Sequence, residues 1–191
     1  MKTGLFFGSF NPVHIGHLAL ANYISEFTDL DQLWFVVSPH NPLKKKISLL
    51  PDQTRRELLE LALEEDDRFV ICDIEFRMPQ PSYTIDTLTY LSEKYPKREF
   101  ILIMGSDSLA SFHKWKNYEL IISRYHRLIY PRLTEQKIEY SEHRNITYLE
   151  NAPIIEVSSS FIREAIHEGK DVRYFLPSKV YDYIFRYNLY K

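Results

Sequence analysis

Short runs of apolar residues recur along the chain and alternate with longer stretches whose apolar residues have helical spacing. The short runs are rich in β-branched and aromatic residues, which is typical of buried strands. They predict strands over residues 4–7, 33–37, 69–72, 100–104, 127–130 and 154–157. Alternation of strand and helix favours an α/β fold built on a doubly wound parallel sheet.

The helical stretches lie between and after these strands. Their spacing predicts helices over residues 15–27, 52–65, 84–95, 108–122 (in two pieces), 159–167 and 178–190. The last two form a small C-terminal helical segment, whereas the polar stretch 131–151 is expected to be a less regular connection. Because the sequence shows no internal repeat and no linker, we expect one domain over residues 1–191.

Composition narrows the class of protein. The chain is 45% hydrophobic and 26% charged, which is close to the globular average and excludes disorder as the main state. Its formal net charge of −2 disfavours a protein that coats nucleic acid, so anionic ligands must be held by local groups. No apolar run approaches the roughly 20 residues that span a bilayer. The one cysteine, Cys72, cannot form an internal disulfide, and with no secretory leader expected we predict a cytoplasmic protein.

The loop after the first predicted strand carries two histidines beside a helix start. Residues 8–17 read Gly-Ser-Phe-Asn-Pro-Val-His-Ile-Gly-His. His14 and His17 are three apart, so they share one face of the first helical turn. Their N–H donors, the free backbone N–H groups and the helix dipole together predict an anion site. Gly16 lacks a Cβ, so a nucleotide can approach the backbone there. A coincidental or metal-binding pair is the alternative, but no carboxylate or cysteine stands beside it.

A second anion site is predicted near the C-terminus. Residues 157–163 read Val-Ser-Ser-Ser-Phe-Ile-Arg, where a predicted strand ends and a helix begins. Consecutive hydroxyls at a helix N-cap, followed by Arg163 in the first turns, suit a phosphate group. Taken alone, the same segment could be an ordinary serine-capped helix with a solvated arginine. Beside the first motif, the phosphate interpretation is favoured.

Residues 8–17 resemble the ATP-binding signature of the His-x-Gly-His nucleotidyltransferases, and residues 157–163 resemble their second element. Three further segments narrow the resemblance to bacterial nicotinate-mononucleotide adenylyltransferases: residues 82–88, residues 103–107 followed by Trp115, and Tyr-Phe-Leu-Pro at 174–177. The resemblance implies a Rossmann-like fold. It also implies a reaction in which ATP and nicotinate mononucleotide give nicotinate adenine dinucleotide and pyrophosphate, with Mg²⁺ bound to the substrate ATP and no protein metal site.

The resemblance also implies roles for individual residues. It assigns catalysis to His14, His17 and Arg163. It assigns ATP binding to Gly8, Ser9, Phe10, Gly16, Lys44, Gly105, Asp107, Ser159 and Ser160. It assigns nicotinate mononucleotide binding to Ser82, Tyr83, Thr84, Asp107 and Trp115, the last as a platform on which the pyridine ring stacks.

Some positions depart from the family pattern or leave alternatives open. Many relatives carry Gly, Asp and Thr where this chain has Phe7, Asn11 and Ser160. These changes are small and affect fine geometry rather than the reaction. Arg132 stands where relatives often have Arg-Pro-Gly, but Leu-Thr follows here, so no role is assigned to it. The Lys-Lys-Lys run at 44–46 is either a cationic loop over the phosphates or a solvated charge run.

Other functions compete with this one. Phosphopantetheine adenylyltransferases share both ATP motifs but lack the Ser-Tyr-Thr and Gly-x-Asp…Trp elements. A non-catalytic nucleotide sensor on the same fold is disfavoured because both histidines and Arg163 are intact. A tRNA synthetase fragment is disfavoured because no large basic surface accompanies the His-Ile-Gly-His. We therefore expect ATP and nicotinate mononucleotide as partners, without nucleic acid or membrane. The tyrosine-rich C-terminal helix suits the core or a subunit contact, which leaves a homo-oligomer open.

Overall fold

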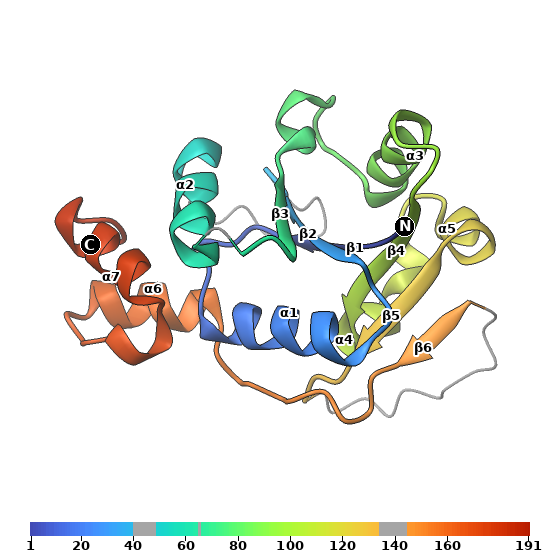
Figure 1. Ribbon diagram of the computed structural model, residues 1–191. Coiled ribbons are helices and arrows are strands. Elements are labelled where there is room, and N and C mark those ends of the chain that lie inside the picture. Colours follow the sequence, from blue (N-terminus) through green and yellow to red (C-terminus); the bar gives the residue numbers. More distant parts are fainter. Residues whose placement is uncertain (40–48, 65, 134–144) are drawn as a thin grey trace.

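A computed structural model describes residues 1–39, 49–64, 66–133 and 145–191 (Figure 1). Within these ranges the strands form one parallel sheet in the order β3-β2-β1-β4-β5-β6. This is the strand order of a doubly wound sheet, so the predicted fold class is confirmed. The strands are β1 (Lys2–Gly8), β2 (Gln32–Val37), β3 (Phe69–Cys72), β4 (Glu99–Gly105), β5 (His126–Tyr130) and β6 (Ile146–Tyr148).

Helices cover both faces of the sheet. Along β2, Trp34 and Val36 face one core cluster while Phe35 and Val37 face the other, because successive side chains of a strand point to opposite faces. One face carries α1 (Ile15–Phe27), α2 (Asp52–Leu63), α6 (Ser159–His167) and α7 (Ser178–Arg186). The other carries α3 (Thr84–Lys94) and α5 (Tyr118–Arg124). The remaining helices are the short α4 (Ser106–Ala110), η1 (Ile74–Arg77), η2 (Phe112–Lys114) and η3 (Arg173–Phe175).

A glycine in left-handed conformation follows the end of α6. Gly169 has a φ of 72°, a left-handed conformation that residues with a Cβ adopt reluctantly. Its N–H donates to the carbonyl of Ile166, and the N–H of Lys170 donates to the carbonyl of Ala165 at 2.8 Å. This pair of bonds is a Schellman motif, which satisfies the last carbonyls of the helix.

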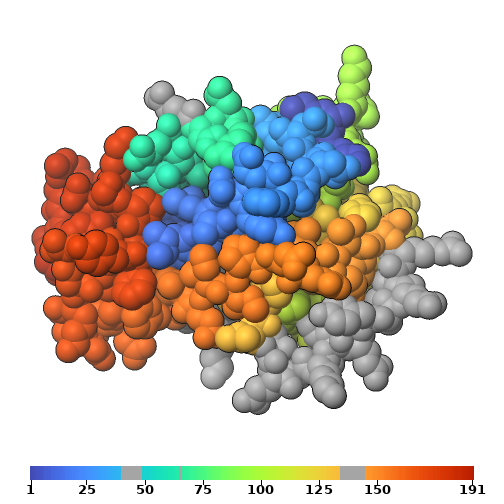
Figure 2. Space-filling model, turned by 60° about the horizontal axis from the view of Figure 1, so that its bottom comes forward, coloured from blue at the N-terminus to red at the C-terminus, as the bar shows by residue number. Residues whose placement is uncertain are grey.

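The prediction for the last strand was wrong. Residues 154–157 are extended but pair with none of the described strands, and β6 lies earlier, within the stretch expected to be irregular. Ile155 and Val157 instead turn their side chains toward a pocket, while Ile154 and Glu156 are exposed. The orange segment that contains them lies alongside α1, drawn in blue (Figures 1 and 2). Alternating apolar residues here reflect an extended segment that lines a pocket.

Two helix predictions also change. The stretch predicted at 108–122 forms three short pieces, α4, η2 and α5, and it runs from Ser106 to Arg124. The C-terminal helix α7 ends at Arg186, and turns follow it up to Tyr190. Within the described residues, no helix is long and apolar enough to cross a membrane.

Candidate active site

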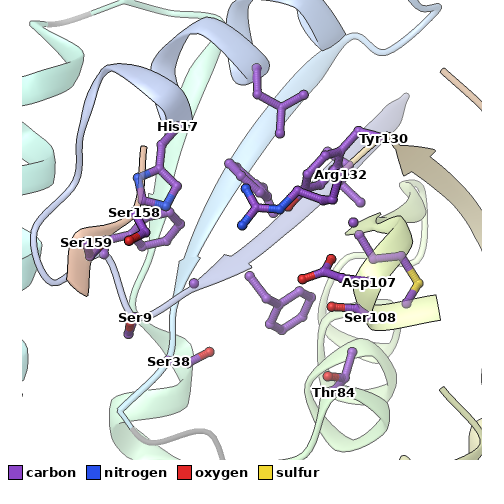
Figure 3. A pocket seen from close by; sticks show the side chains of 18 of the residues that line it. Ser9, His17, Ser38, Thr84, Asp107, Ser108, Tyr130, Arg132, Ser158 and Ser159 are labelled. Atoms are coloured by element: carbon purple, nitrogen blue, oxygen red, sulfur yellow. The ribbon is translucent and has the colours of Figure 1, made fainter. Parts of the chain in front are cut away.

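A cleft of about 420 Å³ opens beyond the carboxyl ends of β1 and β4, where the strand order reverses. Figure 3 shows His17 and Ser159 on one side of it, with Asp107 and Thr84 on the other. Lys44 lies outside the described residues. All the other predicted site residues line the cleft: Gly8, Ser9, Phe10, His14, Gly16, His17, Ser82, Tyr83, Thr84, Gly105, Asp107, Trp115, Ser159, Ser160 and Arg163.

The two histidines open α1 as predicted. His14 is the N-cap, with extended backbone, and its carbonyl accepts from the N–H of His17 at 2.9 Å. The N–H of His14 donates to Nδ1 of His17 at 3.3 Å, which places the ring proton of a neutral His17 on Nε2. The ring of Phe10 is buried and packs edge-on against His17, with centroids 5.1 Å apart. Local packing thus holds the orientation of His17.

His14 is neutral at physiological pH. Burial, and to a lesser extent the nearby positive charge of Arg132, lowers its pKa to about 4. A neutral imidazole donates from only one nitrogen, so His14 can offer a phosphate one N–H and no positive charge. Arg132 and Arg163 supply positive charge to this part of the cleft, and the N-termini of α1 and α6 add the positive ends of their dipoles.

Two hydrogen bonds join the first motif to the second. Ser159 Oγ donates to the carbonyl of Pro12 at 2.8 Å, and Arg163 Nη1 donates to the carbonyl of Asn11 at 2.7 Å. Arg163 Nη2 also donates to Ser160 Oγ at 3.1 Å. Ser158 caps α6 by accepting from the N–H of Phe161 at 3.1 Å. The motifs, about 150 residues apart in the chain, therefore form one surface with two helix N-termini.

Asn11, one of the positions that depart from the family pattern, is buried in the first loop. Its Oδ1 accepts from the N–H of Leu50 at 3.3 Å and from the hydroxyl of Tyr190 at 2.8 Å. Burial raises the pKa of Tyr190, so its hydroxyl remains a donor. Asn11 thus supports the loop from behind, and the C-terminal turn contributes to that support.

Two glycines make room for specific side chains. A Cβ on Gly16 would lie 3.1 Å from His14 Nδ1. The absence of this Cβ was expected to leave room for a nucleotide, but in the structure the His14 ring lies beside it. A Cβ on Gly105 would lie 2.3 Å from a carboxylate oxygen of Asp107. Gly105 therefore lets Asp107 fold back over the end of β4, beside Tyr130. Burial raises the pKa of Tyr130 to about 12, so its phenol stays neutral.

The opposite end of the cleft is formed by the start of α3 and the loop that carries Trp115. The helix α3 begins at Thr84, as predicted, and Tyr83 is its N-cap, so the first backbone N–H groups of the helix have no partner within it. Trp115 is half-buried and packs on Phe112, with ring centroids 5.2 Å apart. Lys116 binds Asp86 at 2.8 Å and lies over the Tyr83 ring, which fastens this loop to α3.

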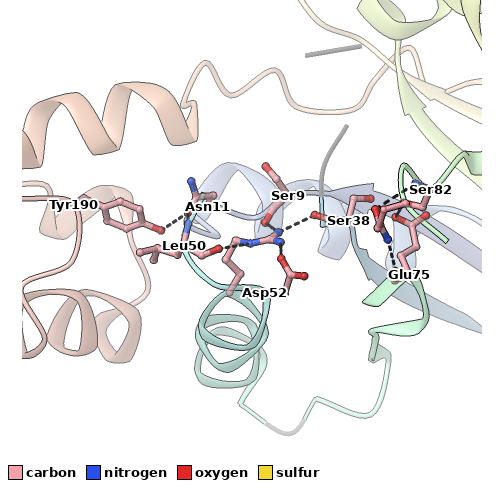
Figure 4. A network of polar contacts seen from close by, with 10 residues as sticks. Ser9, Asn11, Ser38, Leu50, Asp52, Glu75, Ser82 and Tyr190 are labelled. Atoms are coloured by element: carbon pink, nitrogen blue, oxygen red, sulfur yellow. Dashed lines mark hydrogen bonds and ion pairs between the residues drawn. The ribbon is translucent and has the colours of Figure 1, made fainter. Parts of the chain in front are cut away.

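Arg55 is a residue that the sequence interpretation missed. It is fully buried. Its guanidinium donates to the carbonyls of Ser9 at 2.5 Å, Ser38 at 2.8 Å and Leu50 at 3.1 Å (Figure 4). It also binds the carboxylate of Asp52 at 2.5 Å. It thereby joins the loops that follow β1 and β2. A signal existed, because Arg55 falls on the apolar face of α2, in line with Leu58 and Leu59.

Arg132 and Glu75 also line the cleft without having been predicted. Figure 3 shows the Arg132 side chain extending into it, and its backbone N–H donates to Ser106 Oγ at 2.9 Å. Among the described residues, no three His, Cys, Asp or Glu side chains form a group that could hold a metal ion. The cleft therefore offers hydroxyls, imidazoles and guanidiniums, which suit phosphate groups.

Comparison with known proteins agrees with this chemistry. Residues 5–165 match the family model described as cytidylyltransferase-like. Two curated proteins named as probable nicotinate-nucleotide adenylyltransferases share about half of their residues with this chain. The protein of Flavobacterium johnsoniae is 51% identical over 193 residues, covering 100% of both chains. That of Bacteroides thetaiotaomicron is 52% identical over 187 residues, covering 98% of this chain and 92% of its own.

A solved structure has the same fold. The nicotinic acid mononucleotide adenylyltransferase of Plasmodium falciparum, complexed with NaAD, superposes with a TM-score of 0.81 at 20% identity. The superposition covers 99% of this chain and 97% of the other. At this level of identity the likeness shows the fold alone.

Proposed function

The chain belongs to the cytidylyltransferase-like family, as a nicotinate-nucleotide adenylyltransferase, and we propose that it transfers the adenylyl group of ATP to nicotinate mononucleotide in NAD biosynthesis. The products are nicotinate adenine dinucleotide and pyrophosphate. One observation supports assigning this reaction to the cleft. Arg163 and Ser159 donate hydrogen bonds to the backbone of the loop that bears His14, so both phosphate motifs face one cavity.

In this proposal the 5′-phosphate of the mononucleotide attacks the α-phosphorus of ATP in line with the departing pyrophosphate. The attacking phosphate is largely ionised at pH 7, so the protein needs no nucleophile or strong general base. Its task is to orient the two substrates and to stabilise the charge that builds on the phosphate oxygens. No covalent intermediate forms.

His17 and His14 act on those oxygens as hydrogen-bond donors. The bond from the His14 backbone to Nδ1 of His17 directs the Nε2–H of His17 as the donor. Arg163 supplies a permanent positive charge, and two of its nitrogens are held by Asn11 and Ser160. A guanidinium fixed in this way loses little freedom when a phosphate binds.

The residues suit a metal that arrives with its substrate. No group of three metal-ligating side chains is present in the described part of the chain. Mg²⁺ would therefore be held mainly by phosphate oxygens and water. Asp107, which follows the end of β4, is the cleft carboxylate at that strand end. Bound there, Mg²⁺ would neutralise charge on the leaving pyrophosphate. The protein cations and the two helix N-termini stabilise the remaining charge.

The other end of the cleft would receive the pyridine nucleotide. Trp115 offers a ring for stacking, and the first turn of α3 offers backbone N–H groups to the pyridine carboxylate. Binding ATP at one end and the mononucleotide at the other would bring their phosphates to the surface that carries the histidines and Arg163.

Pyrophosphate release tests the proposal. The purified protein should release pyrophosphate from ATP when nicotinate mononucleotide is present, and nicotinate adenine dinucleotide should form in equal amount. Phosphopantetheine in place of the mononucleotide should give none, which separates the related adenylyltransferase. Binding of ATP without turnover would support the non-catalytic sensor instead.

A further inference from the structure

A buried carboxylate lies at the pyridine end of the cleft, and the mechanism above leaves it unused. Glu75 is only 2% exposed and lies in η1, in the connection between β3 and α3. Burying a carboxylate is costly unless hydrogen bonds or charges compensate for the lost water. Its described side-chain partners are hydroxyls rather than cations. A group kept at such a cost beside a binding cleft calls for a role.

The bonds of Glu75 converge on the start of α3. Ser82 Oγ donates to one carboxylate oxygen at 2.9 Å, and Thr87 Oγ1 donates to the other at 2.7 Å. The backbone carbonyl of Glu75 accepts from Gln80 Nε2 at 2.9 Å, and Gln80 Oε1 accepts from the N–H of Ser82 at 3.3 Å. Figure 4 shows Glu75 beside Ser82. Glu75 therefore binds Ser82, which precedes the N-cap Tyr83, and Thr87, which follows it in α3.

We propose that Glu75 is a positioning residue for the nicotinate mononucleotide half of the reaction. By binding the residue before Tyr83 and the second turn after it, Glu75 fixes the direction in which the first N–H groups of α3 point. Those groups are the donors assigned above to the pyridine carboxylate, so the inference rests on the proposed function. Misdirecting them by a small rotation would weaken binding of the acid without altering the catalytic groups.

The contacts of the ATP half do not pass through Glu75. The His-bearing loop is held by Arg55, Ser159 and Arg163, whose described bonds all end on the loops after β1 and β2 or on α2 and α6. Arg55 and Glu75 are thus two buried charged residues, each joined to a different end of one cleft. Each serves as the matched control for the other.

The experiment is a set of initial-rate measurements on full-length variants, with each substrate varied in turn. Glu75→Ala should raise the KM for nicotinate mononucleotide at least tenfold and leave the KM for ATP within twofold. Glu75→Gln, which keeps the shape and one acceptor, should show a smaller rise. Arg55→Met should show the reverse pattern, with the larger increase in the KM for ATP.

Thr87→Val removes one bond to Glu75 while keeping the shape of the side chain, so it provides the test if Glu75→Ala does not fold. It should raise the KM for the mononucleotide about threefold, again without changing that for ATP. Equal rises in both KM values, or a lower melting temperature with both KM values unchanged, would overturn the positioning role. If the wild-type protein makes no dinucleotide at all, the proposed function has failed, and that result is distinct from either pattern.

Discussion

The imidazole rings of His14 and His17 lie against one another, with centroids 3.7 Å apart and planes inclined by 30°. Two imidazolium cations at that distance would repel each other by about 4 kcal/mol at an effective dielectric constant of 20. Burial and Arg132 keep His14 neutral at neutral pH, so the contact between the rings does not place two imidazolium cations together. The close contact of the two rings therefore depends on the neutral state of His14.

Removing either imidazole should impair chemistry more than folding. We expect His17→Ala, and to a similar degree His14→Ala, to lower kcat by roughly 10²–10³, or about 2.7–4 kcal/mol, the scale for one donor to a transition state. His167→Ala, on an exposed histidine at the end of α6, should leave kcat unchanged. Steady-state and single-turnover rates are the measurement. A change of less than threefold in both variants would remove the histidines from the mechanism.

The low pKa of His14 should make the protein less stable in acid. In the unfolded chain His14 takes up a proton near pH 6.5, whereas in the folded protein it does so only near pH 4. Between these values the unfolded state binds more protons, so the free energy of unfolding falls as the pH falls from about 6.5 to 4. The contribution is up to roughly 3 kcal/mol, from about 1.4 kcal/mol per pKa unit.

Urea unfolding at pH 7, 5.5 and 4.5 measures this effect. His14→Gln has no such group, so its stability should change less with pH than that of the wild type. His126, whose pKa is also lowered by burial, is present in both proteins and cancels in the comparison. Identical pH dependence in the two proteins would contradict the assignment.

The sequence predicted five of the six described strands, and most of the residues that it singled out line one cleft, for a physical reason. Buried parallel strands are continuous apolar runs, and phosphate loops require His, Gly and Ser at fixed spacing, so both patterns are visible without the fold. The short β6 was missed because Ile146, Thr147 and Tyr148 are only three residues at a sheet edge and show no apolar run. Arg55 and Glu75 were missed because their value depends on carbonyls and hydroxyls brought to them by folding.

Arg132 should control the protonation of His14. Its positive charge contributes to the low pKa of that imidazole, after burial. We expect Arg132→Met to raise the pKa of His14 above about 4 while leaving it below 6.5, because the larger cause, burial, persists. Lys114→Met, which removes another cation from the cleft wall, should leave the pKa of His14 in place. Nuclear magnetic resonance titration of labelled imidazoles gives both values, and an unmoved pKa in Arg132→Met would refute the coupling.

The enzyme should prefer the acid to the amide. We expect kcat/KM for nicotinate mononucleotide to be at least tenfold above that for nicotinamide mononucleotide, a difference of about 1.4 kcal/mol. The first turn of α3 presents free backbone N–H groups and the positive end of its dipole, from which a carboxylate gains more than a neutral amide. The neighbouring ammonium of Lys116 is already paired with Asp86, so the backbone donors make the selection.

Two initial-rate series at fixed ATP and Mg²⁺ measure this preference, and two variants locate its source. Trp115→Ala should weaken both mononucleotides in parallel, since stacking on a ring does not distinguish an acid from an amide. Lys116→Ala should keep the ratio of the two efficiencies within about threefold, because it leaves the first turn of α3 in place. A ratio that collapses in Lys116→Ala would transfer the selection from the backbone to that ammonium. Equal efficiencies in the wild type would contradict the prediction. They would mean that a carbonyl, rather than an N–H, faces the carboxylate or amide group of the pyridine ring. The amide could then donate a hydrogen bond to that carbonyl, which would offset the advantage of the acid at the helix N-terminus.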